Sequence, residues 1–329
     1  MSILITGGAG YIGSHTVRYY LEQNEEVVVV DNLQSGHIKS VDVNHFYQID
    51  LRDKEELDTV FKNHNIEAVI HFAANSLVGE SMEKPYEYYH NNVYGMMCLL
   101  DVMKENNVYK IVFSSTAATY GEPKNIPILE ADETNPTNTY GETKLAMEKM
   151  MKWFDQAYGI KYVSLRYFNA AGAHESGIIG EDHDPETHLI PLILQVPLGQ
   201  REKIYMFGED YPTEDGTCIR DYIHVMDLAS AHYQALEYLR KDNTSEIFNL
   251  GNGNGYSVKE VIDVARKVTN HPIPAEVKER RAGDPAVLIA SSEKAKRVLG
   301  WRPQFDSLEK IITDGWNWHK NNSQGYSSK

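Results

Sequence analysis

The chain of 329 residues has little cysteine, little positive charge and no long apolar run, and each shortage excludes a class of protein. Only Cys98 and Cys218 are present, too few for a disulfide framework, and neither stands in a CxxC or CxxH cluster. We therefore expect two buried or inert thiols and no metal site. Without 18 consecutive apolar residues a membrane span is excluded, and because Met1 leads directly into Ile3 without a basic leader, we expect a cytoplasmic protein.

Positive charge is scarce because 32 lysines and arginines face 47 aspartates and glutamates, which gives a net charge of −15. Such a surface repels a polyanionic backbone, so nucleic acid is a poor candidate partner. An anionic ligand would have to be held by a few local groups.

Apolar runs alternate with helical patterns in the first half of the chain. We expect strands at 3–6, 27–30, 46–49, 68–72, 111–114 and 162–167, and helices near 13–23, 53–63, 90–106 and 141–157. This alternation, with β-branched runs such as Val27 to Val30, predicts an α/β fold with a doubly wound parallel sheet of the Rossmann type.

After about residue 170 the pattern changes to loops rich in glycine, proline and acidic residues, with amphipathic helices near 226–240, 258–269 and 307–320. We expect a first domain over residues 1–170 and a smaller mixed α/β domain over 171–329, with the chain near 220–245 packing back on the first.

A glycine-rich turn follows the first expected strand. Gly7, Gly10 and Gly13 let the turn tighten and the backbone approach a pyrophosphate at a helix N-terminus, so the segment, Tyr11 and Ile12 included, is a candidate dinucleotide cradle. The spacing is GxxGxxG and not GxGxxG, and such turns also serve packing alone.

Acidic residues end the next two strands. Asp31 stands where a carboxylate accepts hydrogen bonds from ribose hydroxyls and repels a 2′-phosphate, and no arginine stands nearby in the sequence, which favours NAD over NADP. Asp50 and Leu51 stand where an adenine could be held, with a helix cap as the alternative for Asp50.

The spacing YxxxK occurs twice. Tyr140 and Lys144 lead into a helical pattern, so phenol and ammonium would share one face, and the ammonium would lower the phenol pKa until it acts as a base. Tyr120 and Lys124 enclose a glycine and a proline that disfavour a helix, so we take that pair as accidental. A surface tyrosine beside a solvated lysine is the alternative for Tyr140.

Three hydroxyl residues, Ser114 to Thr116, end an expected strand where groups face a ligand in α/β sheets. We take Thr116 as the third catalytic residue. A turn that caps its own backbone is the alternative, and it suits Ser115 best.

Several segments along the chain carry a family resemblance when they are taken together: GGAGYIGSH, VVVVDN, HFAA, NNV, FSSTAATYG, NPTNTYGETK, LRYFNAAGAH, GTCIRDYIHV and RRAGDPA. Over essentially the whole chain, they resemble the UDP-galactose (UDP-glucose) 4-epimerases of the extended short-chain dehydrogenase/reductase family. The resemblance implies tightly held NAD and reversible interconversion of UDP-galactose and UDP-glucose through a 4-keto intermediate. Tyr140 would exchange the proton of the sugar 4-hydroxyl, Lys144 would tune Tyr140, and Thr116 would bind the 4-oxygen.

The resemblance also implies site residues. Cofactor contacts would be Asp31, Asn32, Asp50, Leu51, Phe72, Asn91, Ser114, Lys144 and Phe168. Substrate contacts would be Asn169, Leu189, Phe207, Arg220, Tyr222, Arg281 and Asp284. Guanidinium groups suit a pyrophosphate, although Arg220 and Arg281 could instead form salt bridges with Asp221 or Asp284.

Two positions depart from the pattern of some members. Ser76 replaces a lysine that contacts the cofactor, so pyrophosphate binding would depend more on backbone amides. Leu288 replaces a bulky tyrosine, which would leave room for UDP-N-acetylglucosamine or UDP-N-acetylgalactosamine.

Three other functions remain open. A sugar-nucleotide 4,6-dehydratase would need an Asp-Glu pair after the threonine, where Ala117 and Ala118 stand. A plain dehydrogenase would consume its cofactor, and a non-catalytic dinucleotide-sensing protein would not need Tyr140 and Lys144.

Apolar residues surround much of the helices near 90–106 and 141–157, including Met96, Met97, Leu99, Leu100, Met147, Met150 and Met151. Such helices either pair across a two-fold axis or cover the sheet. We expect a homodimer.

Overall fold

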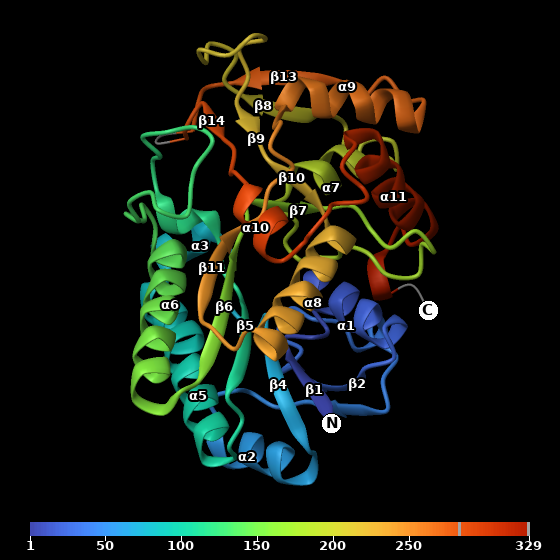
Figure 1. Cartoon of the computed structure of the whole chain (residues 1–329). Helices are drawn as coiled ribbons and strands as arrows, with labels where there is room; N and C mark the ends of the chain where they lie inside the picture. The colour runs from blue at the N-terminus through green and yellow to red at the C-terminus, as the bar shows by residue number, and fades with distance from the viewer. Residues whose placement is uncertain (282–283, 328–329) are drawn as a thin grey trace.

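A parallel sheet of seven strands organises the computed structural model, which describes residues 1–281 and 284–327 (Figure 1). The strand order is β11-β6-β5-β4-β1-β2-β3. The strands are β1 Ser2–Thr6, β2 Glu26–Val30, β3 His45–Tyr47, β4 Ile66–His71, β5 Lys110–Ser114, β6 Lys161–Arg166 and β11 Glu246–Asn249. All six predicted strands occur, and the doubly wound parallel fold is confirmed.

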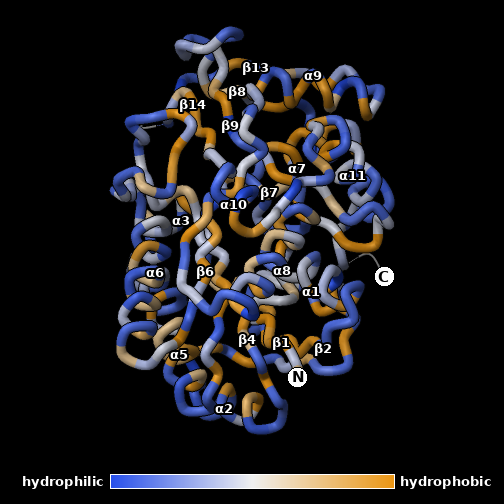
Figure 2. The backbone as a smooth tube through the Cα atoms, viewed as in Figure 1, coloured by the Kyte–Doolittle hydropathy of each residue, from blue (hydrophilic) through white to orange (hydrophobic). Residues whose placement is uncertain are grey.

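Helices cover both faces of the sheet (Figure 1). They are α1 Tyr11–Glu22 and α8 Val225–Lys241 on one face, and α2 Lys54–Asn63, α5 Gly95–Glu105 and α6 Thr139–Tyr158 on the other. Ile3 and Ile5 of β1 belong to the first core, while Leu4 belongs to the second. This alternation is the consequence of a strand buried on both faces, and Figure 2 shows hydrophobic residues along β1 and β4.

The helix predicted near 90–106 is divided in the structure. Its first part is a π-helical segment, Tyr89–Tyr94, which leads into α5 and follows two short helices, α3 Val78–Glu83 and α4 Pro85–Tyr88. Within this segment the buried side chain of Asn92 accepts a hydrogen bond from Asn75 N at 2.8 Å and donates to Asn75 O and Thr143 Oγ1, both at 3.0 Å. Asn92 thereby anchors the loop after β4 to α6.

Most of the other elements lie beyond the carboxyl ends of the sheet strands, at the top of Figure 1, while α10 lies beside β11. Their strands are β7 Asn169–Ala171, β8 Ile204–Phe207, β9 Ile219–Arg220, β10 Tyr222–His224, β12 Tyr256–Ser257, β13 Ala275–Lys278 and β14 Val287–Leu288. Their helices are α7 Leu189–Leu194, α9 Val258–Thr269, α10 Glu293–Val298 and α11 Leu308–Asn321. The three helices predicted after residue 170 are α8, α9 and α11. Ala282 and Gly283 of the RRAGDPA motif lie outside the described residues.

β11, which adds a seventh strand beside β6, was not predicted from the sequence. α8 packs against α1, β5 and β6, and it lies in the chain near 220–245 that was expected to pack back on the first domain. Among residues 1–281 and 284–327, none of the helices has both the length and the apolarity that crossing a bilayer requires.

Candidate active site

A cavity of about 1220 Å³ opens where β1, β2, β4, β5 and β6 end. Ligands bind at this edge in doubly wound sheets, and the volume exceeds the roughly 300–1,000 Å³ typical of one small-molecule pocket. The lining includes all the residues proposed for the cofactor: Gly7, Gly10, Tyr11, Ile12, Gly13, Asp31, Asn32, Asp50, Leu51, Phe72, Asn91, Ser114, Tyr140, Lys144 and Phe168.

The glycine-rich turn closes tightly before α1. Gly7 has a φ of +71°, and a Cβ atom there would lie 2.5 Å from Ala73 N. A Cβ atom on Gly13 would lie 2.1 Å from Gly7 O. In the described structure the N-terminus of α1 has neither a side-chain cap nor an acidic residue in its first turn. Its free N–H groups and positive dipole end therefore suit an anionic group.

Asp31 holds this turn in place. Its carboxylate accepts hydrogen bonds from Ala9 N at 2.9 Å and from Leu33 N at 2.8 Å. Burial raises the pKa of Asp31, and these two bonds oppose that rise. The carboxylate therefore stabilises the turn in addition to accepting hydrogen bonds from any ribose that binds beside it.

Asp50 lies at the same corner and does not cap α2, whose N-cap is Asp53 with a bond from Glu56 N at 3.0 Å. Asn32 donates to Asp50 at 3.1 Å, and Arg52 binds both Asp50 oxygens at 2.7 and 2.5 Å. The hydrogen bonds from Arg52 hold the pKa of Asp50 well below its usual range. Folding thus brings an arginine to this corner, but its guanidinium is paired with Asp50.

Tyr140 and Lys144 lie one turn apart on α6, which begins where Asn138 accepts a hydrogen bond from Gly141 N at 2.8 Å. Lys144 Nζ lies 5.9 Å from the centroid of the Tyr140 ring and donates to Ser114 O at 2.8 Å. Only 3% of Lys144 is exposed. The alternative of a solvated surface lysine is therefore wrong.

Burial acts on both members of the pair. It raises the pKa of Tyr140 to about 12, which a hydrogen bond with Thr116 offsets in part. It lowers the pKa of Lys144 to about 7, against the charge of Glu148. Burial therefore disfavours the charged forms of both groups, and the lowering of the Tyr140 pKa by Lys144 stays a prediction.

The hydroxyls after β5 have separate partners. Ser114 Oγ lies 2.5 Å from Tyr167 Oη, and Ser115 Oγ donates to Glu148 at 2.5 Å. Thr116 Oγ1 accepts from Ala118 N at 3.1 Å and caps a short 3-10 turn. The local cap is therefore Thr116 and not Ser115 as predicted, although Thr116 also lines the cavity.

The second YxxxK pair is split, as predicted. Tyr120 Oη donates to Asn249 at 2.7 Å in the interior, whereas Lys124 is exposed and pairs with Glu133 at 2.8 Å.

The expected substrate residues are only partly brought together. Those that line the cavity are Asn169, Arg220, Arg281 and Asp284, whereas Leu189, Phe207 and Tyr222 are not among its lining residues. Arg220 forms an ion pair with Asp284, which was the alternative prediction for it. Asp221 is instead buried, with Asn252 N at 2.9 Å as a donor. The Arg281 guanidinium lies 4.2 Å from the centroid of the Phe207 ring.

A buried ion pair close to Lys144 was not predicted from the sequence. Arg166 and Glu148 approach to 2.5 Å with 4% of each side chain exposed. Glu148 follows Lys144 by four residues, as Lys144 follows Tyr140, so extending the helical spacing by one turn would have found it.

Comparisons with known proteins agree with this geometry. Residues 3–251 match the NAD dependent epimerase/dehydratase family. The UDP-glucose 4-epimerase of Halalkalibacterium halodurans is 65% identical over 329 residues, covering 100% of this chain and 98% of that protein. A crystal structure of a UDP-glucose 4-epimerase is 62% identical with a TM-score of 0.98, covering 99% of both chains.

A third similar protein was solved with ligands. The UDP-glucose 4-epimerase of Bifidobacterium longum, in complex with NAD+ and UDP, is 41% identical with a TM-score of 0.93, covering 99% of this chain and 100% of that one. With a family match over most of its length and a cavity of the expected form, this chain belongs to the NAD dependent epimerase/dehydratase family.

Proposed function

We propose that the protein interconverts UDP-galactose and UDP-glucose by inverting the configuration at C4 of the sugar. One observation carries the proposal: a single cavity joins the glycine-rich turn, the group of Thr116, Tyr140 and Lys144, and the guanidinium of Arg281. In this order, the three groups suit a dinucleotide, a reacting sugar and a second diphosphate. The similarity to relatives named as UDP-glucose 4-epimerases also supports the proposal.

The lining residues fit NAD. The uncapped N-terminus of α1 would receive the pyrophosphate, and Asp31 would face the ribose of the adenosine. Ser76 lines the cavity in place of the lysine of some relatives, so backbone amides would contribute more to this binding. When bound, NAD supplies a hydride acceptor that returns the hydride within the same turnover.

The chain's own residues would handle the proton and the charge. Tyr140 would take the proton of the sugar 4-hydroxyl, while Thr116 would hold the 4-oxygen. Since burial raises the pKa of Tyr140 to about 12, the phenolate needs positive charge nearby. Lys144 supplies one charge when protonated, and an oxidised nicotinamide ring would supply another. Arg220, once released from Asp284, and Arg281 would bind the diphosphate of the substrate.

UDP-galactose labelled with deuterium at C4 tests this cycle. The hydride returns to the carbon it left, so the UDP-glucose formed should keep the label at C4, as mass spectrometry would show. Exchange of the label with solvent would contradict hydride transfer and indicate deprotonation of carbon instead.

The residues after Thr116 disfavour 4,6-dehydratase activity. Ala117 and Ala118 follow Thr116, and both line the cavity without offering the acid and base that loss of water requires. Formation of a 4-keto-6-deoxy sugar would reverse this assignment.

Leu288 also lines the cavity, and we propose that its small side chain admits UDP-N-acetylhexosamines. Leu288→Tyr is expected to lower kcat/KM for UDP-N-acetylglucosamine at least about tenfold, since the larger ring would collide with the acetamido group, while UDP-glucose turnover stays within about threefold. Leu288→Met is the matched control because it conserves volume. Equal activity of wild type and Leu288→Tyr on the N-acetylated sugar would contradict the proposal.

We propose a homodimer formed through α5 and α6. Most of the apolar residues predicted for this role are buried in the sheet's own core, but Met97 on α5 and Trp153 on α6 are 46% and 64% exposed. The double variant Met97→Glu/Trp153→Glu should halve the mass measured by light scattering at micromolar concentration. Val298→Glu, at a position of α10 that is 40% exposed, should keep the dimeric mass. A monomeric wild type would contradict the proposal.

We also retain the division into a cofactor part, residues 1–170, and a substrate part, residues 171–329, with α8 and β11 returning to the first part. A cytoplasmic location is supported by Cys98 and Cys218, which are free and buried, as is common in reducing compartments.

A further inference from the structure

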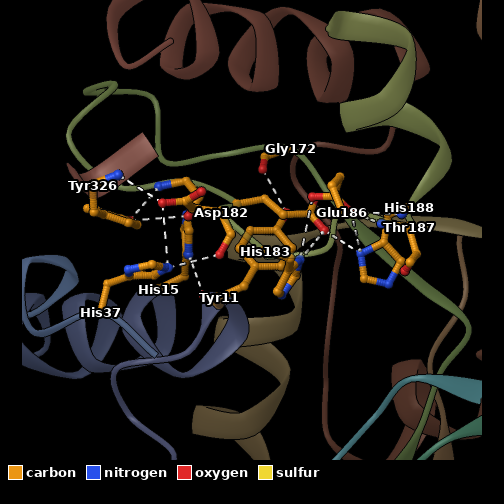
Figure 3. A network of polar contacts seen from close by, with 12 residues as sticks. Tyr11, His15, His37, Gly172, Asp182, His183, Glu186, Thr187, His188 and Tyr326 are labelled. Atoms are coloured by element: carbon orange, nitrogen blue, oxygen red, sulfur yellow. Dashed lines mark hydrogen bonds and ion pairs between the residues drawn. The ribbon is translucent and has the colours of Figure 1, made fainter. Parts of the chain in front are cut away.

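Two histidines and two glutamates gather on the loop between Gly180 and α7 (Figure 3). They are Glu181, His183, Glu186 and His188, and one nitrogen or oxygen from each lies within 4.8 Å of all the others. His183 and His188 also line the proposed active-site cavity, but the proposed reaction gives none of the four a role. No metal site was predicted because the two cysteines form no CxxC or CxxH cluster, whereas the spacing ExHxxExH indicates this group.

The distances suit a metal ion. His183 Nδ1 lies 3.3 Å from Glu181 Oε1 and 3.6 Å from Glu186 Oε2, and His188 Nδ1 lies 3.6 Å from Glu186 Oε1. Around a tetrahedral Zn²⁺ with bonds near 2.0–2.1 Å, neighbouring ligand atoms are separated by about 3.3–3.4 Å. Only the direct contact of His188 with Glu181, at 2.5 Å, is shorter and would have to open.

His183 Nδ1 is the atom of the cluster that lacks a hydrogen-bond partner among the described residues. It is buried, and two carboxylate oxygens lie nearby without meeting it in hydrogen-bond geometry. A cation between the nitrogen and the carboxylates would satisfy all three groups.

The other groups are already oriented. Glu186 Oε1 accepts hydrogen bonds from Thr187 N and His188 N, both at 2.7 Å, which fixes its carboxylate toward the two imidazoles. Only 3% of the Glu181 side chain and 8% of the Glu186 side chain are exposed. Without a metal ion, Glu181 and Glu186 outweigh the effect of burial and raise the pKa of His183 to about 10, and they also raise the pKa of His188. A divalent cation would displace the two protons and leave two carboxylates and two neutral imidazoles, whose charge of −2 it neutralises.

We propose that Glu181, His183, Glu186 and His188 bind one Zn²⁺ per chain. A donor set of two imidazoles and two carboxylates suits zinc among the common divalent ions. The loop also lies against the cofactor cradle: the His183 ring meets the Tyr11 ring at 6.1 Å, and Asp182 accepts a hydrogen bond from Tyr326 N at 2.8 Å (Figure 3). Zinc would therefore fasten the loop between the glycine-rich turn and the C-terminal segment.

The test uses tag-free full-length protein, stripped with a chelator and titrated with Zn²⁺ and with Co²⁺. We expect one Zn²⁺ per chain by elemental analysis, a tetrahedral Co²⁺ absorption spectrum, and a melting temperature raised by about 5 °C. His183→Asn and the half-exposed His188→Asn should each weaken Zn²⁺ binding at least about tenfold. Circular dichroism of the metal-free variants would show that they fold.

His45→Asn is the matched control. Its ring lies 4.6 Å from that of His64, a second histidine pair that could bind metal at the surface. This variant should keep the stoichiometry, the affinity and the cobalt spectrum of the wild type. Absence of saturable binding in the wild type, unchanged affinity in folded His183→Asn and His188→Asn, or loss of binding in His45→Asn would each overturn the proposal.

Discussion

Tyr140→Phe is expected to lower kcat for UDP-galactose by about 10²–10⁴, the range for loss of a positioned acid-base group. The substitution removes only the hydroxyl, and the ring can stay beside Lys144, whose Nζ lies 5.9 Å from its centroid. Retention of NAD should therefore change little. Steady-state kinetics with each UDP-sugar, together with cofactor content after gel filtration, would measure both effects.

The chain contains a matched control for this variant. Tyr120→Phe removes the hydroxyl of the other YxxxK pair, which donates to Asn249 at 2.7 Å away from the proposed base. It should lower stability by about 1–3 kcal/mol, since Asn249 loses a buried partner, and leave kcat within about threefold. If Tyr140→Phe kept more than a tenth of wild-type kcat, Tyr140 would not be the base.

Gly13→Ala is expected to remove most of the retained NAD. The new methyl group would lie 2.1 Å from Gly7 O, so the turn and α1 must separate. Overpacking of this kind costs about 1–3 kcal/mol, which corresponds to a loss of roughly fivefold to 140-fold in cofactor affinity if it falls on the binding conformation. Fluorescence titration with NAD, alongside thermal unfolding, would quantify the two consequences.

Gly95→Ala provides the comparison, because a Cβ atom there meets nothing closer than Leu51 Cβ at 3.8 Å. Within α5 this change should be neutral or stabilise by up to about 1 kcal/mol, with unchanged NAD affinity. Wild-type NAD affinity in Gly13→Ala would show that the cofactor does not depend on this turn.

The sheet could be predicted from the sequence because its strands are buried on both faces. Val27 to Val30 and Ile111 to Phe113 are short, continuous apolar runs, which are typical of parallel strands buried on both faces. β11 escaped prediction because its four residues carry no such run and pair with β6 far back in the chain. The short strands beyond residue 170 depend on long-range pairing in the same way.

The site was predictable where one local pattern placed several groups. The glycines lie at the N-terminus of one helix, α1, and Tyr140 and Lys144 lie on one face of another, α6. Both groups line one cavity. The Arg220–Asp284 pair and the direction of the Tyr140 pKa shift depend on burial, which a sequence does not display. The same holds for Asp50, whose partner Arg52 is decided by side-chain geometry.

The central claim is tested most directly by incubating the purified protein with UDP-galactose, without added NAD, while following UDP-glucose by chromatography and NADH by absorbance. An enzyme whose bound cofactor returns the hydride to the sugar should convert the substrate to a mixture of both sugars with no net NADH. Stoichiometric NADH, or a 4-keto-6-deoxy product, would leave the fold and the cofactor site in place and contradict the proposed epimerisation.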